Sequence, residues 1–205
     1  MIKNVIFDFG QVMVHFEPDY MVAQYVSDPA DRELIASVLF DRLYWDALDR
    51  GTIADSEVIS ASRARLPERL RDYVEPIYNN WIYNIPEIEG MRALVRQVRE
   101  RYGARVFLLS NISTYFASHA SEIPCLSEFE DCVFSAVCGR VKPHADIFQY
   151  LCDKNGLIPS ECLFVDDNAA NIAGAEAFGI HGYLFDGDVA RLEAELETLF
   201  SSKSI

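Results

Sequence analysis

The sequence predicts an α/β protein, a doubly wound parallel sheet with a small helical domain inserted after its first strand. Three observations support this fold class. Short apolar runs, typical of strands buried on both faces, alternate with segments whose apolar residues recur at helical spacing. Several of the runs end directly in polar side chains. Residues 16–84, between the first two runs, carry helical patterns but no strand pattern.

The first expected strand covers residues 5–7 and is followed directly by Asp8. Gly10 then allows a sharp turn or the close approach of a ligand. Taken alone, an Asp after a strand is more often a turn residue than a nucleophile. Whether Asp8 is a functional residue therefore depends on which residues follow the later strands.

Three helices are expected in the inserted region. Asp28 and Pro29 have the pattern of an N-cap and first helical residue, and predict a helix to residue 43. Asp55 begins a second helix, to residue 65, and Pro67 begins a third, to about residue 81. We expect this helical domain to span residues 16–84, and the α/β core to comprise residues 1–15 and 85–205.

The remaining chain alternates between the two patterns, which implies parallel strands joined by right-handed crossovers. Gly103 and Gly156 are placed to end helices. We expect the last five residues to fray. The expected strands cover residues 105–109, 131–137, 162–165 and 182–185, and the expected helices cover residues 86–102, 143–155, a segment from 169 and 189–200.

Composition restricts the possible partners. Half of the 205 residues are hydrophobic, which is enough for a sizeable core. The net charge of −14 argues against general binding to nucleic acid or to anionic membranes. The five cysteines form no CxxC pair, and no signal peptide or membrane span is evident. We therefore expect a soluble, cytoplasmic protein that is a monomer or a weak homodimer.

Polar side chains follow three of the expected strands and precede one helix. Because the carboxyl ends of parallel strands share one edge of a sheet, these groups can meet in one cleft. Clustered carboxylates need a cation, and their hard oxygens suit Mg²⁺. A hydroxyl, an amide and a lysine can hold a phosphate group. The residues concerned are Asp8, Ser110, Asn111, Lys142, Asp166 and Asp167.

These residues lie in four motifs that resemble those of the haloacid dehalogenase superfamily of phosphatases, in the same order. The resemblance covers essentially the whole chain, and it implies a Rossmann-like core with a helical C1-type cap at residues 16–84. Within the superfamily, the motifs resemble the subgroup that contains a bacterial α-D-glucose-1-phosphate phosphatase. The motifs are Phe7-Asp8-Phe9-Gly10, Leu108-Leu109-Ser110-Asn111, Lys142-Pro143 and Phe164-Val165-Asp166-Asp167-Asn168.

The resemblance implies a Mg²⁺-dependent phosphatase of a small phosphorylated metabolite, such as a sugar phosphate, with an aspartyl-phosphate intermediate. Asp8 is the expected nucleophile and metal ligand. The expected roles of the other residues are as follows: Asp166, Asp167 and the Gly10 carbonyl on the metal; Ser110, Asn111, Lys142 and Gln11 on the phosphate; and Asn171 in support.

Gly10 departs from the superfamily pattern, since most of its phosphatases carry an acid/base Asp at this position. His15, Gln11, a residue of the helical domain or water could transfer the proton instead. Alternatively, a sugar 1-phosphate needs less protonation, because its anomeric hydroxyl is more acidic than an ordinary alcohol. Two other functions stay open: a 2-haloacid dehalogenase-type hydrolase, and a non-catalytic protein that binds phosphorylated ligands.

Overall fold

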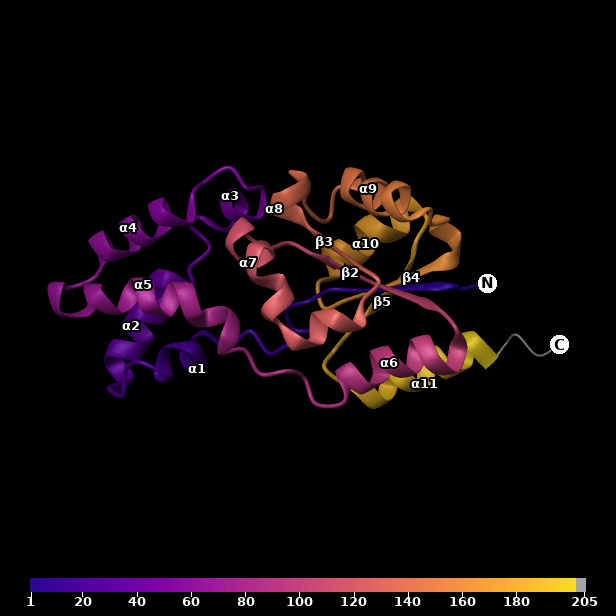
Figure 1. The fold of residues 1–205 in the computed structure, drawn as a ribbon, viewed down its shortest axis with the longest axis horizontal. Helices are drawn as coiled ribbons and strands as arrows, with labels where there is room; N and C mark the ends of the chain where they lie inside the picture. Colours follow the sequence, from indigo (N-terminus) through magenta and orange to yellow (C-terminus); the bar gives the residue numbers. More distant parts are fainter. Residues whose placement is uncertain (202–205) are drawn as a thin grey trace.

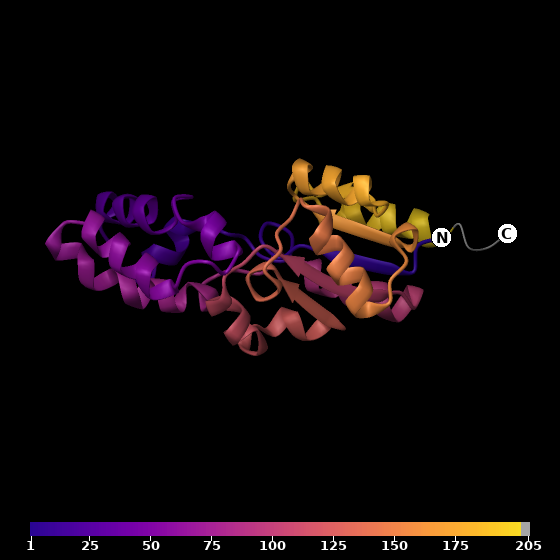
Figure 2. The ribbon, with the colours of Figure 1, turned by 90° about the horizontal axis from the view of Figure 1, so that it is seen from above.

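The computed structural model describes residues 1–201, so most of the C-terminal segment expected to fray lies outside the described residues. The molecule is elongated (Figure 1). A sheet flanked by helices lies at one end and a lobe of helices lies at the other. Figure 2 shows the same two parts from above, joined by a narrower middle. None of the described helices is long and apolar enough to cross a membrane.

The sheet is parallel throughout, with the strand order β3-β2-β1-β4-β5. In the central pairings, Phe7 lies opposite both Leu108 and Val165. Asp8 therefore follows its strand at the level of Asp166, the last residue of β4, and one residue before the end of β2. The predicted fold class is confirmed. The strands are β1 (Asn4–Phe7), β2 (Arg105–Ser110), β3 (Asp131–Phe134), β4 (Cys162–Asp166) and β5 (His181–Leu184).

Helices cover both faces of the sheet. Val5 and Phe7 pack on one side with the apolar residues of α6 (Met91–Tyr102) and α11 (Val189–Ser201). Ile6 packs on the other side with α9 (Ala145–Asn155) and α10 (Ala169–Phe178). Successive strand residues thus point to opposite apolar layers, which explains the unbroken apolar run at the start of the chain.

The helical lobe has an apolar core of its own, which includes Val22, Ile35, Leu66, Val74 and Ile77. The carboxyl ends of the strands face this lobe (Figure 1). Its elements are α1 (Pro18–Ala23), α2 (Pro29–Leu39), α3 (Trp45–Asp49), α4 (Asp55–Arg65), η1 (Glu68–Leu70), α5 (Arg71–Asn80) and η2 (Trp81–Tyr83).

Several predicted boundaries were wrong. Helix α2 ends at Leu39 instead of residue 43, and α9 begins at Ala145 instead of residue 143. Strand β3 ends at Phe134, where the short helix α8 (Ser135–Cys138) begins. The structure also contains elements that were not predicted: α1, α3, α7 (Thr114–His119), η3 (Ala120–Glu122), η4 (Pro124–Glu128) and η5 (Pro159–Glu161).

Helix α6 begins at Met91 instead of residue 86 because the preceding segment is extended. The N–H of His15 donates to the Pro86 carbonyl at 2.9 Å, and the N–H of Ile88 donates to the Met13 carbonyl at the same distance. The segment that leaves the helical lobe thus pairs with the segment that enters it. This pairing joins residues distant in sequence, so local helical spacing could not predict it.

Glu128 links η4 to α6 through hydrogen bonds. Its side chain is buried, and one oxygen accepts hydrogen bonds from Arg92 at 2.9 Å and from Arg96 at 2.6 Å. Arg99 donates to the Glu128 carbonyl at 3.0 Å. The hydrogen bond from Arg96 is the main cause that lowers the pKa of Glu128, to about 2, and Arg92 adds to it while burial opposes.

We predict that Glu128→Gln lowers the free energy of unfolding at pH 7 by about 1–3 kcal/mol, because charge-assisted hydrogen bonds are lost. Since the folded-state pKa is depressed, this contribution is complete above the ordinary glutamate pKa and is lost as the pH falls toward 2. Urea unfolding across this range should show wild type and variant converging at acid pH. The exposed Glu100→Gln serves as control, and a difference that does not depend on pH would contradict the assignment.

Candidate active site

Four segments bring polar groups to the carboxyl edge of the sheet. Asp8 follows β1, Ser110 ends β2, Asp166 ends β4, and Lys142 lies in the loop before α9. All four side chains are buried, Asp166 completely. Residues distant in sequence therefore meet at the carboxyl edge of the sheet, as expected from the polar residues at the ends of the strands.

The ammonium of Lys142 lies between two carboxylates. Its Nζ is 2.7 Å from Asp8 Oδ1 and 2.7 Å from Asp166 Oδ2. The Lys142 side chain is only 1% exposed, so water does not screen these contacts. Burial alone would lower the pKa of Lys142, but the two carboxylates outweigh burial and raise it, so the side chain stays charged.

The backbone around Lys142 is held from two sides. Asn111 accepts the Lys142 N–H through Oδ1 at 2.8 Å and donates through Nδ2 to the Lys142 carbonyl at 3.0 Å. On the other side, Gly174 of α10 approaches Pro143 so closely that an added Cβ would lie 2.3 Å from the Pro143 carbonyl oxygen. The Lys142–Pro143 peptide bond is cis. Gly174, one of the small residues of α10, thus allows this helix to pack closely against Pro143. The sequence did not predict this contact.

Asp166 is oriented by the start of the next helix. Asn171 donates to both of its oxygens, at 3.1 and 3.0 Å, and the Asn168 N–H donates to Oδ1 at 2.8 Å. The predicted supporting position of Asn171 agrees with this geometry. With Lys142 on Oδ2, the carboxylate is fixed in one orientation.

The carboxylates of Asp8, Asp166 and Asp167 can each place an oxygen within 4.8 Å of the others. Burial raises the pKa of Asp8 to about 6, the nearby Asp166 adds to the rise, and Lys142 opposes it. Burial and Asp166 also raise the pKa of Asp167. One ammonium does not balance three carboxylates. This cluster of hard oxygens with excess negative charge therefore fits a divalent cation such as Mg²⁺.

The other predicted site residues have different surroundings. The Ser110 hydroxyl makes no hydrogen bond within residues 1–201, so it is free to bind a ligand. Gln11 is exposed, adopts a positive φ of 56°, and donates from Nε2 to the Phe16 carbonyl at 3.3 Å. The Asn111 amide already bonds the Lys142 backbone on both sides. The predicted phosphate-binding roles of Gln11 and Asn111 stay predictions.

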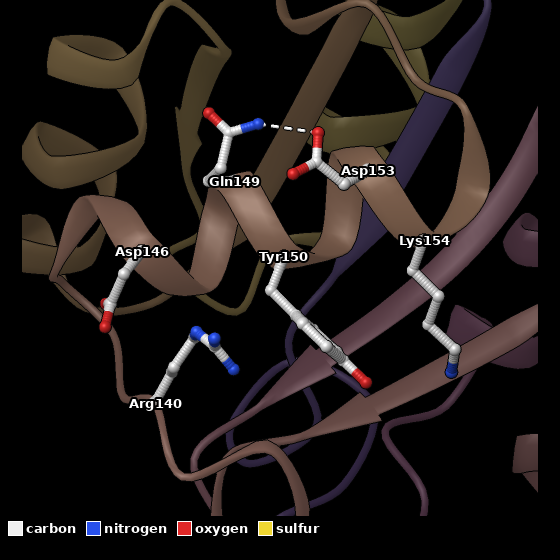
Figure 3. A pocket seen from close by; sticks show the side chains of 6 residues that line it. All are labelled: Arg140, Asp146, Gln149, Tyr150, Asp153 and Lys154. Atoms are coloured by element: carbon white, nitrogen blue, oxygen red, sulfur yellow. Dashed lines mark hydrogen bonds between the residues drawn. The ribbon is translucent and has the colours of Figure 1, made fainter.

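A surface pocket of about 530 Å³ lies elsewhere, over α9, and includes none of the predicted site residues (Figure 3). Several of its polar side chains already have partners. Gln149 donates to Asp153 at 2.6 Å, and Lys154 Nζ lies 2.8 Å from Asp131. The guanidinium of Arg140 lies 5.0 Å from the Tyr150 ring centre. The candidate active site is therefore the polar edge of the sheet and not this pocket.

Comparison with known proteins identifies the family of the chain. A family model for haloacid dehalogenase-like hydrolases matches residues 2–179. The chain is 28% identical over 191 residues to a D-ribitol-5-phosphate phosphatase of Bacteroides thetaiotaomicron, covering 89% of this chain and 91% of the relative. It is 27% identical over 210 residues to a phosphoglycolate phosphatase of Mannheimia succiniciproducens, covering 92% and 90%.

The fold is also found among solved structures. A haloacid dehalogenase family enzyme of Bacteroides thetaiotaomicron, solved with magnesium and inorganic phosphate, superposes with a TM-score of 0.69. The match covers 94% of this chain and 99% of that enzyme, at 19% identity. At this identity the likeness establishes the shared fold.

We predict that Gly174→Ala lowers the free energy of unfolding by about 1–3 kcal/mol, because the new methyl group must displace the backbone of Pro143. Chemical denaturation measures this loss. Ala173→Ser, which adds one atom at the exposed neighbouring position of the same helix, should change stability little. A Gly174→Ala protein as stable as wild type would show that the close approach to Pro143 is not a constraint.

Proposed function

The chain belongs to the haloacid dehalogenase-like hydrolase family, and we propose that it is a Mg²⁺-dependent phosphatase of a small phosphorylated metabolite. The observation that carries this proposal is the placement of Lys142 between Asp8 and Asp166 at the carboxyl edge of the sheet. A buried carboxylate, a second carboxylate and a fixed cation are the groups that phosphoryl transfer to an Asp requires. The phosphatase relatives support the same reaction class.

In the proposed reaction, a carboxylate oxygen of Asp8 attacks phosphorus and displaces the alcohol, leaving an aspartyl phosphate that water then hydrolyses. Lys142 holds Asp8 in position and neutralises negative charge at the phosphoryl group. The free Ser110 hydroxyl donates to a phosphoryl oxygen. Asn111 positions Lys142 through its two backbone hydrogen bonds.

We propose that Asp8, Asp166, the Gly10 backbone carbonyl and Asp167 hold Mg²⁺. When bound, this ion would neutralise charge on the phosphoryl oxygens and hold them for in-line attack. Asn171 and the Asn168 N–H orient Asp166 for such a role. The excess of three carboxylates over one ammonium supports a divalent ion at this place.

We propose that residues 16–84 form the C1-type cap of the family and close the site. An aromatic cluster joins the two parts: Phe16, on the entering segment, has ring contacts with Trp45 at 5.4 Å and with Trp81 at 5.7 Å. Trp81 in turn stacks on Phe116 of the core at 5.8 Å. These rings place an apolar wall between the helical lobe and the sheet, which favours a small substrate over a macromolecule.

A sugar phosphate is the proposed substrate class. The two phosphatase relatives are named for ribitol 5-phosphate and phosphoglycolate, both small phosphorylated metabolites. Gly10 in place of the acid/base Asp favours an ester whose alcohol leaves readily, such as a sugar 1-phosphate. The α-D-glucose-1-phosphate phosphatase subgroup that the motifs resemble is the finer form of this proposal.

We predict Mg²⁺-dependent hydrolysis of at least one ester in a panel of α-glucose 1-phosphate, glucose 6-phosphate, ribitol 5-phosphate and phosphoglycolate. Released phosphate is measured with Mg²⁺ and with EDTA. Asp8→Asn should lower kcat by about 10³-fold or more, since the nucleophile is lost. No turnover of any ester would contradict the phosphatase proposal, and metal-independent release of halide from 2-chloropropionate would favour the dehalogenase alternative.

We predict that Mg²⁺ raises the Tm of the wild-type protein, because it binds the folded carboxylate cluster and not the unfolded chain. Asp166→Asn should weaken Mg²⁺ binding at least about tenfold in calorimetry. Asp146→Asn, an exposed acid at the start of α9, is the matched control and should bind Mg²⁺ as wild type does. Equal affinity in Asp166→Asn would place the metal elsewhere.

A further inference from the structure

Gly10 leaves the proposed reaction without a proton-transfer side chain at that position. The departing alcohol oxygen must receive a proton, and the attacking water must lose one. The space beside Gly10 is open, since an added Cβ would meet no atom within 4 Å. A side chain reaching in from another segment could therefore act there.

The nearby residues considered from the sequence are poorly suited. The Gln11 amide does not titrate and already donates to the Phe16 carbonyl. His15 is exposed, on the segment whose backbone pairs with Pro86. The helical lobe offers a better group.

Asp49 ends α3, one of the elements with which the lobe touches the core. In both the contacts and Figure 1, α3 lies beside α8, the short helix after β3. The chain just after α3 comes close to α8 at Gly51, where an added Cβ would lie 2.6 Å from the Ala136 carbonyl oxygen. In α8, the Ser135 hydroxyl accepts the N–H of Ile112 at 2.9 Å, directly after the Ser110–Asn111 end of β2.

The Asp49 carboxyl is half-buried and makes no hydrogen bond or ion pair within residues 1–201. Burial raises its pKa to about 6. Among charged groups, Lys142 acts on it most strongly and lowers the pKa, ahead of Asp46, which raises it, and of Arg42 and Arg50, which lower it. Coulomb interactions weaken with distance and with exposure to water. Lys142, a residue of the candidate site, thus stabilises the Asp49 carboxylate more than the arginines of its own segment do. The contact of α3 with α8 places this helix at the end of the lobe nearest the core.

We propose that Asp49 is the proton-transfer residue of the reaction, supplied by the helical lobe in place of the side chain that Gly10 lacks. The inference rests on the proposed phosphatase function. In the first step the bond between phosphorus and the alcohol oxygen breaks as Asp8 attacks, and the protonated Asp49 gives its proton to that oxygen. In the second step the Asp49 carboxylate takes a proton from water, whose oxygen attacks phosphorus, and the bond between phosphorus and Asp8 breaks. Inorganic phosphate leaves, with Asp8 free and Asp49 protonated again.

The pKa of Asp49 supports both halves of this cycle. An acid that titrates near 6 is present in both protonation states around neutral pH, which is the condition for efficient proton transfer in either direction. Because Asp49 has no hydrogen-bond or ion-pair partner among residues 1–201, both of its carboxyl oxygens are available to substrate or water. Its position on the lobe couples proton transfer to the docking of the lobe on the core.

The test compares Asp49→Asn with wild type on alkyl phosphates and on p-nitrophenyl phosphate, with Mg²⁺ present. We expect kcat/KM for alkyl esters to fall by about 10²–10⁴-fold, and kcat/KM for the aryl ester to change by less than about tenfold, because nitrophenolate leaves without a proton. The aryl ester should also give a burst of nitrophenol, since the second step has lost its base. Retained aryl cleavage shows that the variant is folded. Asp46→Asn, on the exposed side of the same helix, should behave as wild type.

The outcomes separate the inference from the function on which it rests. If wild type cleaves no ester at all, the phosphatase proposal itself fails. If wild type is active and Asp49→Asn loses nothing, or loses alkyl and aryl activity equally, Asp49 is not the proton-transfer residue. A loss selective for alkyl esters in His15→Gln, with Asp49→Asn unaffected, would assign the role to His15 instead.

Discussion

The ammonium of Lys142 lies 2.7 Å from each of two buried carboxylates, and much of the surrounding structure holds it there. Burying such a group costs free energy that its ion pairs scarcely recover, so the arrangement is evidence of function more than of stability. Asn111 bonds the Lys142 backbone in both directions. Gly174 allows α10 to approach Pro143 closely, and thus supports the loop from the opposite side. The sheet contributes by ending β1 and β4 at the same level, which places Asp8 beside Asp166.

The sequence predicted the features that depend on local pattern. The apolar runs specified the strands, and the polar residues at their ends specified the site, because parallel topology gathers those ends at one edge. The sequence did not predict features that depend on contacts between residues far apart along the chain. The start of α6 is delayed by pairing of the Pro86 region with His15, and β3 is cut short where α8 turns toward the lobe. Asp49 carried no signal in the sequence either, because its place beside the core depends on the contact between α3 and α8, which are distant in sequence.

Chemistry and selectivity are divided between the two parts of the molecule. The sheet carries the groups proposed to act on the phosphoryl group and metal, all on segments fixed by the core. The helical lobe carries the aromatic wall around Phe16 and the carboxyl of Asp49. In the proposed reaction, the core would act on the phosphoryl group of many esters, and the lobe would determine which alcohols fit and how readily they leave. If Asp49 transfers the proton as proposed, the lobe carries out a chemical step for which the core, with Gly10, has no side chain.

The central claim, that Asp8 forms a covalent bond to phosphorus, can be tested directly by trapping the intermediate. The protein is mixed with Mg²⁺ and a turned-over ester, quenched with acid during turnover, and digested for mass spectrometry. If Asp8 is the nucleophile, one added phosphoryl group is expected on the peptide that contains Asp8, and none in Asp8→Asn. Active hydrolysis with no phosphorylated peptide, and an Asp49→Asn protein that also accumulates none, would contradict it and indicate direct attack by water.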